Sequence, residues 1–388
     1  MMRKAFIFLL CAVFLFGAAC RRIEEPVGGT VTLTFRTEEP ATRAVTPGDG
    51  NVADGGGIYC TKSGDVVTPD LVILIMDENG AVKKRYPNDG SLGASDDNYG
   101  TVIESDYDSN HATTLSVSFT FNEVGSFSVY AVANLGSDGN LDNLSTLLSG
   151  VSSASALDNM QLGYSGTAPS VGSRMPLSAT GTLQVAQGLY GKFNGLLELE
   201  MLRCVAKVQL TFKNLTGAAL SLTDCSVTFK DMNTRKAWLF PRDPDFVELG
   251  DTSPADNKDD NFGDYTTVTA DMADLTDIPY IDNLATDTVD ERDRDAFTKP
   301  LLFFPSIAPR QTVPSAGNRY LCDISFKVND VQKTFTNLPI HDLYTQDILA
   351  LKRNQYLHIE TTISQGSNVS FNFRVENWVA HNPTVIFH

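Results

Sequence analysis

Residues 30–35 read Thr-Val-Thr-Leu-Thr-Phe, a strict alternation of hydroxyl-bearing and apolar side chains. Successive side chains of a β-strand point to opposite faces, so Val31, Leu33 and Phe35 share one face and the three threonines share the other. β-Branched and aromatic residues also favour strands. The stretch therefore predicts a strand whose apolar face is buried in a core.

On the N-terminal side of this strand, Met1–Ala19 has the three parts of a secretory signal peptide. Arg3 and Lys4 precede an apolar run, and small residues follow it at 17–19. Cys20 comes next, where a lipoprotein signal peptidase needs a cysteine whose thiol carries a lipid. We therefore expect residues 1–19 to be a lipoprotein signal peptide and Cys20 to be lipidated. The alternative is an ordinary secreted protein that begins near a cysteine. In either case, the apolar run is too short to remain as a membrane span.

A polar loop follows the strand on its C-terminal side. Residues 37–44 include a proline and two glutamates, which predicts an exposed segment. A cut between Arg43 and Ala44 would free the protein from its lipid and remove the strand at the same time. Residues 20–43 are thus expected to form a lipid-anchored leader with a removable first strand. The residues alone favour the simpler alternative, an uncut surface loop with an ordinary arginine.

Composition limits the partners of this chain. Its 388 residues carry a formal net charge of -17, and removal of the signal peptide takes away two further positive charges. Such a surface repels nucleic acid and anionic headgroups, so we expect no nucleic-acid partner. The length suits two domains. Beyond the leader, the cysteines are widely spaced and form no CxxC pair, so neither a zinc site nor a disulfide framework is indicated, and their pairing is left open. They are Cys60, Cys204, Cys225 and Cys322.

Further strand patterns predict a first β-sandwich over residues 44–195. Asp70–Met76 is an apolar strand, and the Asn79-Gly80 pair turns it into a hairpin that returns over 81–86. Two alternating stretches, 115–121 and 127–131, flank a turn near residue 125. Asp142–Leu148 reads as a short surface helix. Residues 151–195 are rich in small residues and read as loop, except for a strand over Thr182–Val185.

A second sandwich is predicted over residues 196–388. We expect one long strand over Glu198–Phe212, with the domain boundary just before it near residue 195. Later strands are expected from residue 225 onward, over Tyr320–Val328, over Tyr356–Ile363 and over residues 369–375. Residues 251–295 are acidic and read as an irregular surface insertion. The fold class is therefore all-β, two tandem sandwiches of transthyretin-like or Greek-key type with a short surface helix.

The segment 379–388 contains the strand formers Val385, Ile386 and Phe387. Two interpretations stay open for it. It is either a donor strand that pairs with another molecule or an edge strand of the second sandwich.

A search for catalytic chemistry finds no motif. The five histidines are scattered without an HExxH pair, and the chain has neither a P-loop nor a dinucleotide-binding glycine pattern. The acidic run at 256–264 lacks the EF-hand spacing and is better explained as a solvated charge run. Trp238 and Trp378 both read as packing residues rather than carbohydrate platforms. We therefore expect no enzyme, no cofactor and no metal site.

Several short segments, taken in order, resemble the fimbrillins of Bacteroidales, which are lipoprotein-derived type V pilins. The sequence departs from the family at Gly17, where a larger apolar residue is usual, in the acidic insertion, and in the short segment after Trp378. The last departure leaves open whether this chain can donate a strand as a stalk subunit does. The matching segments are the signal with Cys20, Thr42-Arg43-Ala44, Asp70–Gly80, Val129–Asn134, Met175-Pro176-Leu177, Leu202–Val208, Lys352–Tyr356 and Val375–Trp378.

The resemblance implies a mode of assembly. Family members are exported to the outer-membrane surface as lipoproteins, and an arginine-specific protease then cuts after the first strand, here between Arg43 and Ala44. The groove left by that strand is filled by the C-terminal strand of a neighbouring fimbrial subunit. In this chain Val31, Leu33 and Phe35 would leave. The incoming residues would be Val385 and Phe387, or Ile386 in the opposite register.

The functional expectation is a structural fimbrial subunit that contributes to adhesion, with other fimbrial subunits and host surface ligands as partners. Whether it serves as stalk, tip or anchor stays open. An alternative of a different class is a surface lipoprotein that binds a glycan or a host protein and never polymerises. It predicts a chain that keeps Cys20 and stays uncut at Arg43.

Overall fold

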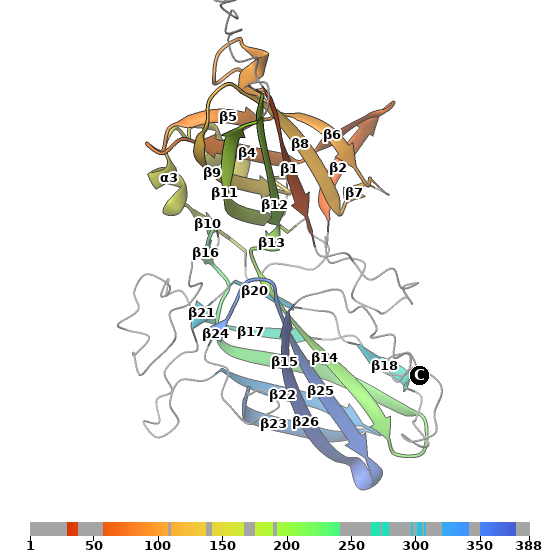
Figure 1. Ribbon diagram of the computed structural model, residues 1–388. Coiled ribbons are helices and arrows are strands. Elements are labelled where there is room, and N and C mark those ends of the chain that lie inside the picture. Colours follow the sequence, from red (N-terminus) through yellow and green to blue (C-terminus); the bar gives the residue numbers. More distant parts are fainter. Residues whose placement is uncertain are drawn as a thin grey trace, which may run out of the picture.

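The computed structural model shows the all-β fold that the alternating stretches predict (Figure 1). Two β-sandwiches follow one another along the chain, with a few short helical segments attached. The residues that the structure describes are 29–37, 57–107, 110–136, 142–166, 175–188, 192–240, 265–271, 274–278, 296–297, 301–304, 306–307, 320–340 and 350–377.

The N-terminal sandwich is one hydrogen-bonded path of strands folded over on itself. The order is β5-β4-β9-β11-β12-β1-β8-β6, with β13 beside β11. The hairpin contact between β11 and β12 is short, so the path behaves as two layers, β5-β4-β9-β11 and β12-β1-β8-β6. The strands are β1 (Gly29–Arg36), β4 (Leu71–Met76), β5 (Val82–Tyr86), β6 (Thr101–Ser105), β8 (Thr114–Phe121), β9 (Gly125–Ala133), β11 (Leu177–Gln187), β12 (Phe193–Glu200) and β13 (Leu202–Arg203).

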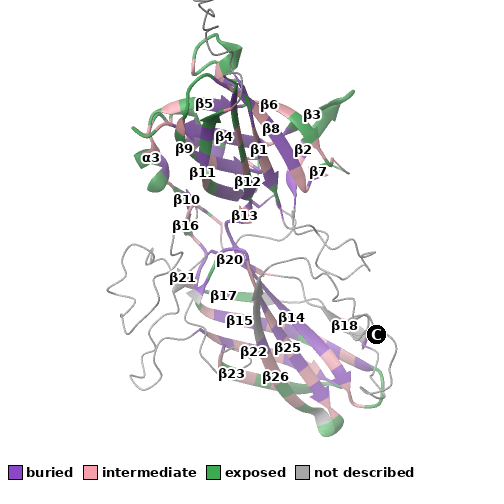
Figure 2. Cartoon of the chain, viewed as in Figure 1, coloured by how far each residue is buried: buried purple, intermediate pink, exposed green. Residues whose placement is uncertain are grey.

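Alternation explains how these layers make a core. Every second residue of β1, β8 and β9 is buried, and the inward side chains of both layers form one apolar cluster. Figure 2 shows many buried residues along the strands, with exposed residues in the loops and also at outward positions within strands such as β12. A small sheet of β2 (Ile58–Ser63), β3 (Val66–Pro69) and β7 (His111–Ala112) adjoins this sandwich.

The expected hairpin near residue 80 is confirmed. β4 pairs antiparallel with β5, and Gly80 takes a φ of +75° at the turn. The Asp77 carboxylate accepts hydrogen bonds from the backbone N–H groups of Asn79 and Ala81, both at 2.9 Å. The turn near residue 125 differs from this one, because β8 pairs with β1 and β6 whereas β9 pairs with β4 and β11. That turn therefore carries the chain from one layer to the other.

The short helix is also confirmed, as α2 (Leu144–Ser149). The Asn143 side chain caps it by accepting a 3.0 Å hydrogen bond from the backbone N–H of Thr146, and Gly150 ends it.

The prediction of a loop over residues 151–195 is wrong. This region holds α3 (Ala154–Asp158), β10 (Gln161–Gly163), which pairs with β16 (Lys236–Trp238), all of β11 and the start of β12. Its small residues fit against neighbouring strands, as the buried Ser178 and Ala179 do on β11.

The C-terminal sandwich packs two five-stranded sheets around a second apolar cluster. One sheet has the order β19-β14-β25-β26 with β20 beside β14, and the other β17-β15-β22-β23 with β18 beside β15. Its strands are β14 (Ala206–Leu215), β15 (Leu220–Asn233), β17 (Tyr265–Asp271), β18 (Leu275–Ile278), β19 (Ala296–Phe297), β20 (Leu301–Phe303), β22 (Leu321–Val328), β23 (Val331–Pro339), β25 (Gln355–Ser364) and β26 (Asn368–Asn377). Smaller elements are β21 (Ser306–Ile307), which pairs with β24 (Ala350–Leu351), and the 3-10 turns at Asp96–Asn98 and Gln365–Ser367.

Two expectations about this half need correction. The single strand expected over Glu198–Phe212 is divided into β12, β13 and β14, because the chain passes there from the first sandwich to the second. β12 thus keeps residues up to Glu200 in the first sandwich, past the boundary expected near residue 195. The insertion 251–295 is not wholly irregular, since β17 and β18 lie in it and pair with β15. Among the described residues, no helix has the length and apolar character to cross a membrane.

Candidate functional site at the first strand

β1 lies inside its layer, between β8 and β12. It pairs antiparallel with β8 over its whole length, from Gly29 to Arg36, and parallel with β12 from Val31 to Arg36. Both partners lie far along the chain, so sheet pairing and packing hold β1 in place rather than short connections. We call the space that β1 fills between these two strands the β1 slot.

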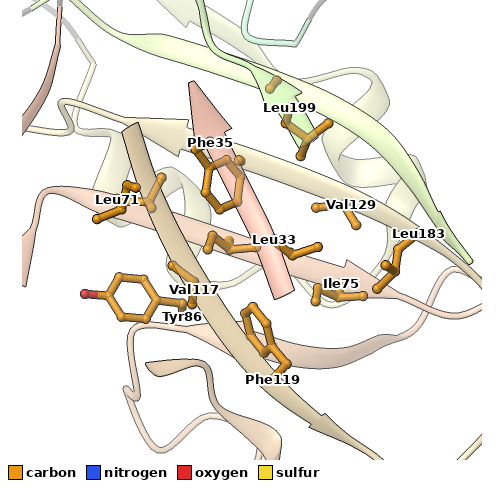
Figure 3. Close-up of a cluster of buried hydrophobic side chains, with 14 of the residues drawn as sticks. Leu33, Phe35, Leu71, Ile75, Tyr86, Val117, Phe119, Val129, Leu183 and Leu199 are labelled. Carbon is orange, nitrogen blue, oxygen red and sulfur yellow. The ribbon is translucent and has the colours of Figure 1, made fainter. Parts of the chain in front are cut away.

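The inward face of β1 is completely buried. Val31, Leu33 and Phe35 are each 0% exposed, as the alternation predicts. Burying one such side chain is worth about 1.5–3 kcal/mol, so the three together are a major part of this core. Figure 3 shows Leu33 and Phe35 among side chains from both layers. The labelled neighbours are Leu71, Ile75, Tyr86, Val117, Phe119, Val129, Leu183 and Leu199.

The outward face of β1 is polar. The Thr34 hydroxyl lies 3.1 Å from that of Ser116 on β8, and Arg36 Nη2 lies 3.4 Å from Glu198 Oε1 on β12. The side chains of this ion pair are 60% and 55% exposed, so solvent screens their attraction. This face therefore adds little to stability, but its contacts differ along the strand, with a hydroxyl pair at Thr34 and an ion pair at Arg36.

The C-terminal end of β1 is where the chain leaves the slot. The Arg36 carbonyl accepts a 2.8 Å hydrogen bond from the N–H of Met201, and the N–H of Thr37 donates to the Thr113 carbonyl at 2.9 Å. A surface hollow of about 320 Å³ opens beside this end. Its lining residues are Arg36, Thr37, Glu198, Leu199 and Glu200.

Removal of β1 would have two physical consequences. The facing edges of β8 and β12 would present unpaired N–H and C=O groups, which are a template for another strand. The core would also lose the side chains of Val31, Leu33 and Phe35. An extended segment with apolar residues at alternate positions would satisfy the edges and fill the core together.

Several predicted site residues lie outside the described residues. These are Cys20, Arg43, Ala44, Val385, Ile386 and Phe387, and Trp378 is also outside. Lipidation, cleavage and the donor role therefore stay predictions. Trp238 lies in β16, where it is half-buried, and the two residues after it are buried.

The cysteines of the described chain are buried and carry free thiols. Burial raises the pKa of Cys60 to about 11, assisted by the charges of Asp106 and Asp70. Burial likewise raises the pKa of Cys225 and of Cys322 to about 12. Because the thiolate is the nucleophile, these side chains act as core residues at neutral pH. Within the part of the chain that the structure describes, no three His, Cys, Asp or Glu side chains gather as metal ligands would.

A second constellation, which the sequence analysis did not assign to a site, lies where the two sandwiches meet. The guanidinium of Arg353, just before β25, is buried. It donates to the Ser178 hydroxyl of β11 at 3.2 Å and to three backbone carbonyls at the end of β16 and just after it. Those carbonyls belong to Trp238 at 2.9 Å, Phe240 at 3.2 Å and Leu239 at 3.4 Å. One side chain thus links both halves of the protein.

Other polar contacts support the same junction. Arg203 Nη1 donates to Asn354 Oδ1 at 2.9 Å, and the Asn354 N–H donates to the Val205 carbonyl at 2.9 Å. Within the first sandwich, the buried Asn134 amide just after β9 donates to the Met175 carbonyl at 2.9 Å, where the chain enters β11. These residues all belong to segments that carry the family resemblance. Their position in such segments was the one available signal for the junction.

Comparisons with known proteins give structural similarity alone. No family model and no curated protein matches the sequence. The fold is similar to that of the tip fimbrial protein Mfa3 from Porphyromonas gingivalis, with 10% identity, 91% of this chain and 100% of that chain covered, and a TM-score of 0.48. It is also similar to the fimbrilin FimA from P. gingivalis, with 11% identity, 93% and 99% covered, and a TM-score of 0.46.

Proposed function

We propose that this chain is a structural subunit of a fimbrium on the outer-membrane surface and that it contributes to adhesion. It joins its neighbours by exchanging β1 for a strand of another fimbrial subunit. One observation carries the proposal: β1 is an internal, fully packed strand, yet a single cut between residues 37 and 57 would detach it from the rest of the sandwich. Its role is therefore structural rather than catalytic.

The cut is expected to act as the trigger. In the intact chain, the connection holds β1 beside its own slot at a high effective concentration, so a strand from another molecule competes poorly. After cleavage at Arg43 by an arginine-specific protease, β1 becomes a separate strand that leaves the complex once it dissociates. A tethered strand of a neighbouring subunit then fills the open edges and the core. Lipid on Cys20 would hold the uncut protein at the membrane and would depart with the leader.

The N-terminus of the protein on its native cell surface tests this proposal. We expect the mature chain to begin at Ala44 and to run in ladders of high mass, because the cut both frees the chain from lipid and opens the slot. Intact mass measurement and N-terminal sequencing of surface-extracted protein give the result directly.

An Arg43→Ala variant is the matched control. It should keep its lipid-modified Cys20, remain monomeric and stay with the membrane. A wild-type protein that is lipid-modified at Cys20, uncut and monomeric would contradict assembly by strand exchange.

A further inference from the structure

The apolar face of β1 does not by itself fix how a strand sits in the slot. A shift by one residue would turn Val31, Leu33 and Phe35 outward, but a shift by two would return apolar residues to the inward positions. Some other feature must therefore select the register. The two ends of β1 differ in chemistry, and each forms a contact that depends on the identity of one residue.

At the N-terminal end of β1, only glycine fits at position 29. A Cβ atom built on Gly29 would meet the backbone of Phe193, at its carbonyl oxygen, carbon and nitrogen, well inside the 3.0 Å limit that real Cβ atoms keep. Phe193 cannot move aside easily, because it begins β12 and pairs there with Gln187 of β11. A shift of β1 by two residues in either direction would bring Val27 or Val31 to this point. The glycine position thus excludes both shifted registers.

The other end favours a positive charge. Arg36 stands opposite Glu200 on β12 in the sheet register, and its guanidinium reaches Glu198 at 3.4 Å. On its other side, the β8 residue opposite is the uncharged Thr114. An acidic residue at this position would face two carboxylates. The contact is exposed, so its contribution is modest and falls with salt.

We propose that the β1 slot selects its partner strand by the residues at these two end positions. The partner carries glycine at the position of Gly29, a basic residue at the position of Arg36, and three inward apolar residues between them. This inference rests on the proposed strand exchange and specifies what is exchanged. The segment 379–388 contains no glycine in any register. The partner is therefore a strand of a different fimbrial subunit rather than this segment of a second copy.

Peptide exchange into the full chain tests the selection. The folded chain is cut after Arg43 with an arginine-specific protease, which leaves β1 seated in its slot. A fluorescent peptide of residues 27–37 is then added in mild urea below the unfolding midpoint, and its uptake is followed by anisotropy. We expect the wild-type peptide to enter and a G29V peptide to enter at least tenfold less. A peptide of residues 378–388 should not compete.

Charge reversal tests the other end independently. An R36E peptide should enter about threefold to tenfold less than wild type at low salt, since an attraction becomes a repulsion. A Glu198→Lys chain should largely restore its entry. A matched T34A peptide, changed on the outward face between these ends, should enter nearly as well as wild type.

The outcomes separate the two levels of the proposal. If no peptide enters, including the wild-type sequence, strand exchange itself fails and the selection fails with it. If wild-type and G29V peptides enter equally, strand exchange stands but the glycine selection is overturned. Efficient entry of the 378–388 peptide would overturn the assignment of the partner to a different subunit.

Discussion

Replacing Phe35 with alanine is expected to lower the free energy of unfolding of the N-terminal sandwich by about 3–5 kcal/mol, the usual cost of a buried Phe→Ala change. The Phe35 side chain is 0% exposed and packs between the two layers, so its removal leaves a cavity that β8 and β12 cannot fill without distorting their pairing. Urea denaturation and, independently, calorimetry measure this decrease in the free energy of unfolding.

The same variant should change how fast β1 leaves the slot after cleavage. Since about 1.4 kcal/mol corresponds to a factor of ten, F35A is expected to speed dissociation of β1 from the cut chain by roughly 10²-fold or more. Phe326, which is also 0% exposed but lies in the C-terminal core, provides the matched control. F326A should destabilise the C-terminal sandwich while leaving β1 release unchanged. Equal release rates for F35A and wild type would contradict the role of β1 as a plug held by its apolar face.

Replacing Arg353 with methionine is expected to lower the free energy of unfolding by about 3 kcal/mol. It should also make the two sandwiches unfold separately. Methionine keeps the length of the side chain but removes the donors to the carbonyls of Trp238 and Phe240. Taking the donor away from a buried acceptor costs about 1–3 kcal/mol. Because Arg353 links β11, the segment after β16 and the start of β25, its loss should split one calorimetric transition into two.

Lys352→Met is the control for this experiment. Lys352 is the adjacent residue, but it is exposed, so its replacement should leave the transition unchanged. A chain with Arg353→Met that unfolds in a single transition at the wild-type temperature would show that the junction does not depend on the guanidinium.

Local patterns predicted the strands well, because burial on one face imposes alternation on the sequence. The stretch 30–35 specified β1 and its buried face, and Asn79-Gly80 specified the hairpin. What alternation cannot specify is which strands become neighbours. β8 and β9 follow one another across a turn yet lie in opposite layers, and the path from β12 to β14 continues a similar pattern while changing sandwich. Both features depend on contacts between residues far apart in sequence.

The apolar face of the site could be predicted from the sequence, but the contacts that depend on distant residues could not. Val31, Leu33 and Phe35 could be identified from their spacing, since three apolar residues on one face require a core. Gly29 gave no comparable signal, because its importance comes from the approach of Phe193, far along the chain. Arg353 was equally hidden, since a buried arginine is explained only by the carbonyls that surround it.

In the proposed assembly, β1 leaves its slot before subunits join. Thr34 and Ser116 stand directly opposite each other on the outward face, with their hydroxyl oxygens 3.1 Å apart. A T34C/S116C pair therefore has a spacing suited to a disulfide that ties β1 to β8. The four native thiols in the described chain are buried and should not interfere.

The measurement is the size distribution of this double variant after cleavage at Arg43 in the presence of the other fimbrial subunits on its native cell surface, with and without reductant, beside a wild-type chain treated identically. The oxidised variant is predicted to stay monomeric, and the reduced variant to form high-mass ladders like wild type. Ladders that form equally well while the disulfide holds β1 in place would contradict assembly through the β1 slot.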